Sequence, residues 1–119
     1  MKPDETKQLT IEALEDVKGR DIVALDTTRL SSLFDWLIIA SADSSRQARA
    51  MAQRVQERMK SHGAEVLGVE GEPGGDWILV DLGSVVVHVM HPATRAYYNL
   101  EELWGPQFVP ATRRHAASS

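Results

Sequence analysis

The stretch DWILVDLGSVVVHVMHP, residues 76–92, decides how this chain folds. It contains two apolar runs, residues 76–82 and 85–90, which are joined by the tight link Gly83–Ser84. Two such runs around a short glycine-containing link are typical of neighbouring strands in a hairpin. Pro92 follows at once, and proline is favoured in the first turn of a helix because its missing N–H has no partner there. The stretch therefore predicts strand, strand and helix in that order.

The residues before this stretch predict a third strand and a long helix. EVLGVE, residues 65–70, is a further strand candidate, and GEPGG, residues 71–75, has the composition of a turn. The helix opens with Ser44, has Gln47 at the spacing of a capping box, and closes at Gly63. Its apolar residues recur at three- and four-residue steps and so predict one buried face. They are Ala48, Met51, Ala52, Val55 and Met59.

The N-terminal part of the chain predicts one more helix and two buried strands. Residues 4–18 carry a narrow apolar stripe, and Gly19 stands where a helix commonly ends in a left-handed conformation. DIVALD, residues 21–26, and WLIIA, residues 36–40, are short apolar runs. Runs of this kind are typical of strands that are buried on both faces.

The C-terminal part predicts a last helix and a tail. In the helix that begins at Pro92, Tyr97, Leu100 and Trp104 share one face, and we expect Tyr97 and Trp104 to pack against the core. Residues 106–119 contain two prolines and no sustained periodicity, so we expect a flexible C-terminal tail.

The order of these elements predicts the fold class. Helix, strand, strand, helix, three strands and helix indicate a single α/β domain at residues 1–105, with a mixed β-sheet flanked by helices. The 119 residues are enough to bury one core. The composition, 43% hydrophobic and 25% charged, is that of an ordinary globular protein.

Charge, cysteine content and termini exclude several classes of protein. The net charge of −4 argues against a broad basic face that grips nucleic acid but is compatible with a basic protein partner. Without cysteine there is no disulfide framework and no thiol nucleophile. The polar N-terminus is unlike a secretory signal, and the apolar runs are too short to cross a bilayer. We expect a cytoplasmic protein that does not bind membranes.

Side chains suited to catalysis are few. His88 and His91 form H-x-x-H, but residues at odd spacing in a strand face opposite sides, so a shared metal is not expected. No G-x-S-x-G motif marks a serine nucleophile. In nucleotidyltransferases, a Gly-Ser turn is followed by a strand with two carboxylates one residue apart, and these carboxylates hold metal ions. In this chain the run after Gly83–Ser84 is VVVHVM, which contains no carboxylate. We therefore expect no enzyme: no catalytic residue, no metal and no cofactor.

Three segments together resemble the ribosomal silencing factor family, also called Iojap-related or RsfS. They are SSLFDWLIIASADSSRQARAMAQRV, VEGEPGGDWILVDLGSVVVHVMHP and TRAYYNLEELW, in the family's order and spacing. The resemblance covers roughly residues 6–105. The chain departs from the family's usual pattern at Ser84, where Asp is common, and at Met90, where Phe is common. We expect Met90 to fill an apolar pocket, since methionine adapts well to irregular space.

The resemblance implies a nucleotidyltransferase-like fold without the catalytic carboxylates, and a protein that acts by binding. It implies that the chain binds the large ribosomal subunit through the large-subunit ribosomal protein numbered fourteen. Bound there, it would block association with the small subunit and repress translation under nutrient limitation. It also implies a homodimer when the protein is not on the ribosome. Because mitochondrial and plastid relatives act in ribosome assembly, a large-subunit assembly factor is the alternative function.

Interface anchors are usually aromatic residues and arginine. Within residues 76–82, Trp77 and Asp81 share a face with Leu79, opposite an apolar set that suits the core. A helix lying over that face would produce the same pattern. Tyr98 and Glu101 lie around the last helix from its apolar stripe. We expect the contact surface for the ribosomal protein to consist of Trp77, Asp81, His88, Arg95, Tyr98 and Glu101.

Other interpretations compete with this surface. A strand histidine such as His88 is commonly a half-buried structural residue. The long helix carries Arg46, Arg49 and Arg54, which could touch ribosomal RNA. Because glutamine and glutamate are interleaved with them, a solvated helix face is favoured, and no direct sequence-specific nucleic-acid binding is expected. A nucleotide-using enzyme of the same fold is disfavoured by the missing carboxylates.

Overall fold

The structure, a computed structural model, describes residues 1–104 and 108–110, with side chains for residues 1–102. The elements in chain order are α1 (Pro3–Asp16), β1 (Arg20–Asp26), β2 (Trp36–Ser41), α2 (Ser45–Ser61), β3 (Gly68–Glu70), β4 (Trp77–Asp81), β5 (Val85–Met90), α3 (Pro92–Tyr98), α4 (Leu100–Trp104) and β6 (Phe108–Pro110).

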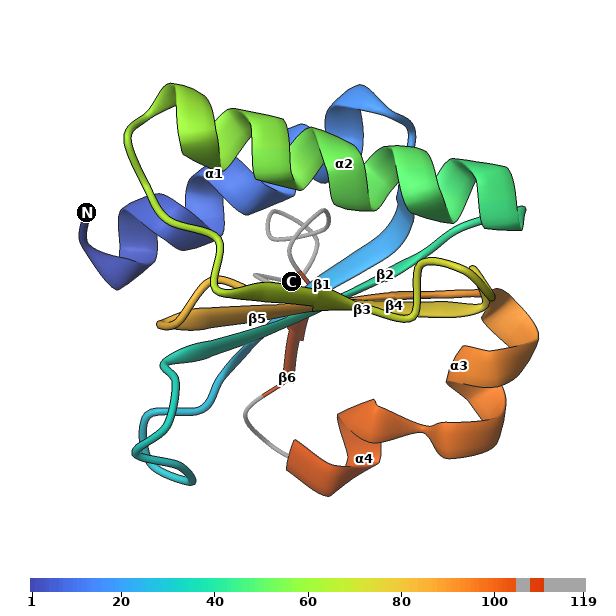
Figure 1. The fold of residues 1–119 in the computed structure, drawn as a ribbon. Coiled ribbons are helices and arrows are strands. Elements are labelled where there is room, and N and C mark those ends of the chain that lie inside the picture. Colours follow the sequence, from blue (N-terminus) through green and yellow to red (C-terminus); the bar gives the residue numbers. More distant parts are fainter. Residues whose placement is uncertain (105–107, 111–119) are drawn as a thin grey trace.

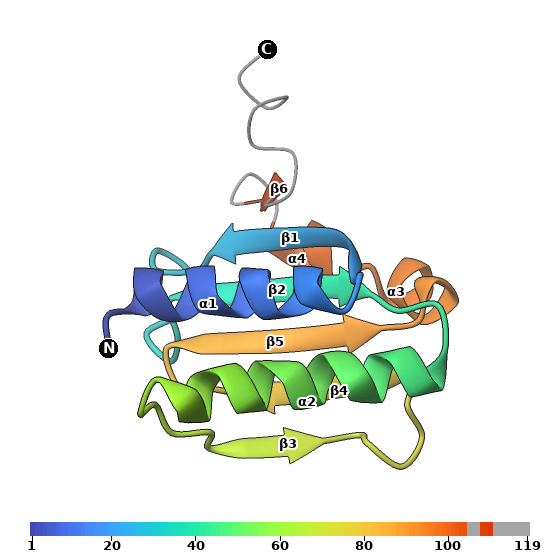
Figure 2. The same cartoon turned by 90° about the horizontal axis from the view of Figure 1, so that it is seen from above.

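The strands form one mixed sheet in the order β3-β4-β5-β2-β1-β6. Strands β2 and β5, in the middle, are parallel, and the other neighbouring pairs are antiparallel. Helices α1 and α2 lie side by side on one face, while α3 and α4 lie on the opposite side (Figure 1). Seen from above, the two long helices run along the strands (Figure 2). The predicted single α/β domain with a mixed sheet and flanking helices is confirmed.

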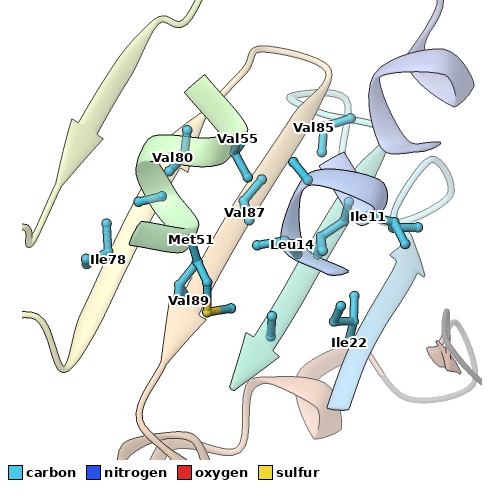
Figure 3. Packing of buried hydrophobic residues seen from close by; sticks show 14 of the residues in the cluster. Ile11, Leu14, Ile22, Met51, Val55, Ile78, Val80, Val85, Val87 and Val89 are labelled. Carbon is cyan, nitrogen blue, oxygen red and sulfur yellow. The ribbon is translucent and has the colours of Figure 1, made fainter. Parts of the chain in front are cut away.

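The main core lies between the sheet and the two long helices. The apolar face of α2 is completely buried there, as its periodicity predicts, and Met51 and Val55 meet side chains from β4 and β5 (Figure 3). Alternate residues of each strand point into this core. Its strand residues include Ile22, Ala24, Ile38, Ala40, Ile78, Val80, Val85, Val87 and Val89.

A second, smaller apolar cluster lies on the other face of the sheet. Its buried members are Val23, Leu25, Leu37, Ile39 and Met90. Met90 is fully buried, so it fills an apolar pocket as expected. Because β1 and β2 contribute to both clusters, their apolar runs are continuous rather than alternating.

Several predicted boundaries need correction. Helix α1 ends at Asp16, two residues before the predicted end, because Lys18 already has a left-handed backbone (φ 61°).

At the start of α2, the Ser44 hydroxyl accepts a hydrogen bond from the backbone N–H of Gln47 at 3.0 Å, as predicted. The return bond differs from a capping box, since the Gln47 side chain accepts from the N–H of Asp43, at 2.6 Å, instead of from that of Ser44. Strand β3 is also shorter than the predicted 65–70.

The predicted last helix is two helices. Asn99 adopts a left-handed conformation (φ 48°) after α3, and α4 starts at the next residue. Asparagine tolerates this conformation better than most residues because its short polar side chain can bond locally. Tyr97 is exposed whereas Leu100, after the break, packs against the second apolar cluster, so these two residues do not share the single apolar face that was predicted. The side chain of Trp104 lies outside the described part of the chain.

A short strand occurs where only a flexible tail was expected. The backbone of Phe108–Pro110 pairs antiparallel with β1 as β6. This strand was not predicted. Residues 105–107 and 111–119 lie outside the described residues, so for them the expectation of a flexible tail stays a prediction.

Candidate interaction surface

Strand β4 presents one set of side chains away from the long helices. Ile78 and Val80 are fully buried in the main core, whereas Trp77, Leu79 and Asp81 are half-buried on the other face. The predicted alternation is therefore confirmed. On neighbouring β5, His88 pairs with Leu79 in the register of the sheet. The open side of β4 and β5 carries three of the six predicted contact residues, Trp77, Asp81 and His88.

Trp77 and His88 form a hydrogen-bonded pair on this surface. The indole Nε1 of Trp77 donates to Nδ1 of His88 at 2.8 Å, and the two rings lie 5.8 Å apart between centroids. Burial lowers the pKa of His88 from 6.5 to about 4 because it penalises the charged imidazolium. His88 is therefore neutral at pH 7, and its proton resides on Nε2 because Nδ1 accepts. One role of His88 is to orient the Trp77 ring.

Two tyrosines from α3 complete an aromatic cluster, defined here as Trp77, Tyr97 and Tyr98. The rings of Trp77 and Tyr98 are 4.8 Å apart between centroids, and Tyr97 meets Tyr98 edge-on at 5.1 Å. Tyr98 is 52% exposed and Tyr97 82% exposed. Tilted and edge-on arrangements of this kind are the favoured geometries of aromatic pairs.

Tyr97 corrects the sequence interpretation, which assigned it to packing. It points to solvent because the chain leaves α3 at Asn99 before an apolar face can continue. The signal in the sequence that could have indicated this is Asn99 itself, a residue type common at helix C-termini. A hollow of about 360 Å³ lies beside the cluster and is lined by Asp76, Trp77, Ala93, Thr94, Tyr97 and Tyr98.

Arg95 and Glu101 pair with each other. The Nη2 atom of Arg95 lies 3.1 Å from the Glu101 carboxylate, and the side chains are only 11% and 23% exposed. Nη1 of Arg95 also donates to the carbonyl oxygen of Asp21 at 2.7 Å and to the hydroxyl of Ser41 at 2.9 Å. Arg95 therefore has internal partners on three other segments, α4, β1 and β2, and the partner of Glu101 is Arg95 itself on α3.

Asp81 lies apart from the aromatic cluster. It is four residues along β4 from Trp77, a distance of about 13 Å at the rise of a strand. Its carboxylate accepts the N–H of Gly83 at 2.9 Å and thereby stabilises the β4–β5 turn. The exposed carboxylate nearer the cluster is Asp76, which lines the hollow and which the sequence interpretation did not select.

Two of the arginines singled out on α2, Arg49 and Arg54, contact the chain's own atoms. Nη1 of Arg49 donates to the carbonyl of Glu72 at 3.1 Å, so it holds the turn before β4. Arg54 pairs with Asp16 of α1 at 3.1 Å. Both contacts are exposed, which agrees with the favoured interpretation of a solvated helix face.

Within the described side chains, no group of three or more His, Cys, Asp or Glu residues is placed to hold a metal ion. None of the helices in the described ranges has the length and apolarity needed to span a bilayer.

Comparison with known proteins gives a consistent family. A family model described as ribosomal silencing factor during starvation, RsfS, matches residues 1–118. The Chromobacterium violaceum protein named ribosomal silencing factor RsfS is 53% identical over 107 residues, which cover 90% of this chain and 88% of that protein. A crystal structure of a protein from that species superposes with a TM-score of 0.87 at 53% identity, over 90% of this chain and 89% of the other. The mouse protein named mitochondrial assembly of ribosomal large subunit protein 1 is 31% identical over 99 residues, 81% of this chain and 43% of that protein.

Proposed function

Because this chain belongs to the ribosomal silencing factor family, we propose that it binds the large ribosomal subunit and represses translation by blocking association with the small subunit. The proposed contact is the large-subunit ribosomal protein numbered fourteen, and the proposed condition is nutrient limitation. The protein would act in the cytoplasm, would require no catalysis, and would form a homodimer when it is not on the ribosome.

The observation that carries this proposal is the aromatic cluster. Isolated apolar residues are normal on a protein surface, but three neighbouring aromatic rings, two of them exposed, beside a hollow are the usual composition of an interface anchor. Tyr97 and Tyr98 can bury their rings against a partner while their hydroxyls remain hydrogen-bonded at the rim.

Charge around the cluster supports a basic protein as the partner. Asp76 lines the hollow, and Glu72 is exposed on the turn just before it. With a net charge of −4, the chain would be attracted to a basic ribosomal surface. Such complementarity increases the rate of association more than the final affinity.

Blocking subunit association needs only affinity and bulk. The described domain measures 35 × 33 × 26 Å. If it is bound through one side, its remaining thickness of at least 26 Å would stand where the small subunit must approach. An interface of ordinary size, about 800 Å² per partner, is sufficient for a stable complex.

Replacing Tyr98 or Trp77 with alanine tests the surface. We expect each variant to lose affinity for isolated large subunits by about thirtyfold, since truncating an anchor at the centre of an interface costs about 2 kcal/mol or more. Co-sedimentation measures the affinity, and an assay that joins purified subunits measures the block.

Two controls keep this test specific. Leu67→Ala removes an exposed leucine beside the C-terminal end of α2 and should bind like the wild type. Circular dichroism should show that Tyr98→Ala is folded, because its side chain is half in solvent. If Tyr98→Ala co-sediments with large subunits as tightly as the wild type does, the aromatic cluster is not the contact. If the wild-type protein does not reduce the joining of purified subunits, the proposed function is wrong.

A large-subunit assembly factor is the second candidate, and the name of the mouse relative favours it. Both functions use the same binding surface but differ in timing. An assembly factor should accumulate on immature large particles, and its loss should leave precursors. A repressor should sediment with mature free large subunits and lower the pool of joined ribosomes.

A further inference from the structure

The segment that carries Tyr97 and Tyr98 has little hydrophobic attachment of its own. Among the residues of α3, all of which the structure describes, none is buried. Leu100, at the start of α4, is half-buried against the second apolar cluster. Segments with few buried apolar contacts open locally at low free energy. Polar contacts must therefore contribute much of what holds these tyrosines in place.

Arg95 supplies those contacts from the middle of α3. Its Nε and Nη2 atoms bond the Glu101 carboxylate at 3.1–3.3 Å, while Nη1 bonds Asp21 O at 2.7 Å and Ser41 Oγ at 2.9 Å. One planar guanidinium thus connects α3 to α4, to the start of β1 and to the end of β2.

The receiving side of this contact belongs to the sheet. Asp21 has a left-handed backbone (φ 49°) at an irregularity in the β1–β2 ladder, and its carbonyl is the one that accepts from Arg95. Ser41 is 2% exposed and pairs with Met90 at the end of the central β2–β5 pair. The Arg95 bonds therefore tie a segment with few buried contacts to β1 and β2 of the sheet.

We infer that Arg95 is a positioning residue: the Arg95 clamp, made of Arg95, Glu101, Asp21 and Ser41, holds the aromatic cluster in the geometry that a partner meets. Arg95 acts through Tyr97 and Tyr98, not by touching the partner, because only 11% of its side chain is exposed. What the cluster binds rests on the proposed function, whereas the clamp itself does not.

Lysine cannot replace arginine in this arrangement. A guanidinium presents five donors in a fixed plane and can serve a carboxylate on one edge and two further oxygens on the other. A lysine ammonium keeps the charge but is a single point, so Arg95→Lys should loosen the segment nearly as much as Arg95→Ala. This distinguishes the clamp from a role of the positive charge alone.

Hydrogen exchange of the partner-free protein tests the clamp. We expect amides of residues 92–102 to exchange about tenfold faster or more in Arg95→Ala and Arg95→Lys, since hydrogen bonds to charged groups carry that much stabilisation. Protection in α1 and α2 should not change. Arg54→Ala, which breaks an exposed arginine–aspartate pair between α2 and α1, is the matched control and should leave the exchange of residues 92–102 unchanged. If Arg95→Ala fails to fold, Arg95→Lys and Glu101→Gln give the same readout. Unaltered exchange in residues 92–102 would overturn the clamp.

A double-mutant cycle on large subunits separates positioning from direct contact. Arg95→Ala alone should weaken binding about tenfold, and in the Tyr98→Ala background it should add less than about twofold, because the ring it positions is absent. Additive losses would identify Arg95 as a contact and contradict the inference. If Tyr98→Ala itself binds normally, the proposed surface fails, while the exchange measurement still decides the clamp.

Discussion

At the scale of single residues, the Trp77–His88 pair shows how a partly buried imidazole is kept neutral. His88 lies on β5 with its Nδ1 lone pair directed at the indole N–H of Trp77, and burial lowers the pKa of His88 to about 4. Protonation would place a donor against a donor and a charge in a poorly hydrated site. The neutral form is therefore the one that supports the Trp77 geometry.

The pH dependence of stability should report this histidine. Its pKa is about 4 in the folded protein and near 6.5 when unfolded, so the unfolded state binds the proton first as the pH falls. The part of the stability that depends on neutral His88 is fully present above pH 6.5 and is lost as the pH falls from 6.5 to 4. We expect the free energy of unfolding to fall by about 2–3 kcal/mol from this group between pH 7 and 4.5.

Urea unfolding of wild type and His88→Gln across this range isolates the effect. Glutamine offers an acceptor to Trp77 but does not titrate, so the variant should lack this part of the pH dependence. His62→Gln, at an exposed position after α2, should retain it. Parallel pH profiles for wild type and His88→Gln would contradict the lowered pKa.

At the scale of elements, the turn between β3 and β4 positions the start of β4. Gly75 has a left-handed backbone (φ +78°) and is buried against α2. A Cβ added there would lie 2.6 Å from the Cβ of Ser45 and 2.9 Å from Nη1 of Arg49. The turn therefore fits closely against the first turns of α2, two residues before Trp77.

Gly75→Ala and Gly63→Ala form a matched pair for this turn. Gly63 has a similar backbone (φ +74°), but nothing lies within 4 Å of an added Cβ. Alanine at 63 should cost about 1 kcal/mol of unfolding free energy from backbone strain alone. Alanine at 75 should cost roughly 2–4 kcal/mol, because overpacking adds to the same strain. Urea denaturation measures both, and equal losses would contradict the close fit.

At the scale of the whole molecule, the sheet places β5, the strand after Gly83–Ser84, between β4 and β2. The long helices cover one face of the sheet, and β5 presents Val86 and His88 to the other. A nucleotidyltransferase needs paired carboxylates on the strand after its Gly-Ser turn to hold metal ions. The strand after Gly83–Ser84 has apolar residues and a neutral histidine instead.

Thermal unfolding with magnesium and nucleoside triphosphates tests the enzyme alternative. A ligand present at a hundred times its dissociation constant stabilises the folded state by about 2.7 kcal/mol, which raises the melting temperature of a domain of this size by roughly 5–15 °C. We expect no such shift with any of the four common nucleotides. A reproducible rise in melting temperature that needs both metal and nucleotide would support the enzyme alternative.

The sequence alone determined most of the secondary structure and the two faces of the central strands. The apolar spacing of Ala48 to Met59 and the cap at Ser44 specify α2, and the alternation around Trp77 specifies which side of β4 is buried. These features depend on residues two to four positions apart, and helical and extended periodicity is a local property. Of the expected surface, Trp77, His88 and Tyr98 do lie together, and their binding role stays a prediction.

Only the tertiary structure decided how distant residues meet. Arg95 bonds atoms 54 and 74 residues away in the sequence, which gives it and Glu101 an internal role that residue type alone does not indicate. The helix break at Asn99 turned Tyr97 outward, and β6 joined a sheet edge from a segment without periodicity. The physical reason is that such contacts depend on where separate faces pack against each other, a balance of burial and polar pairing set by the whole chain.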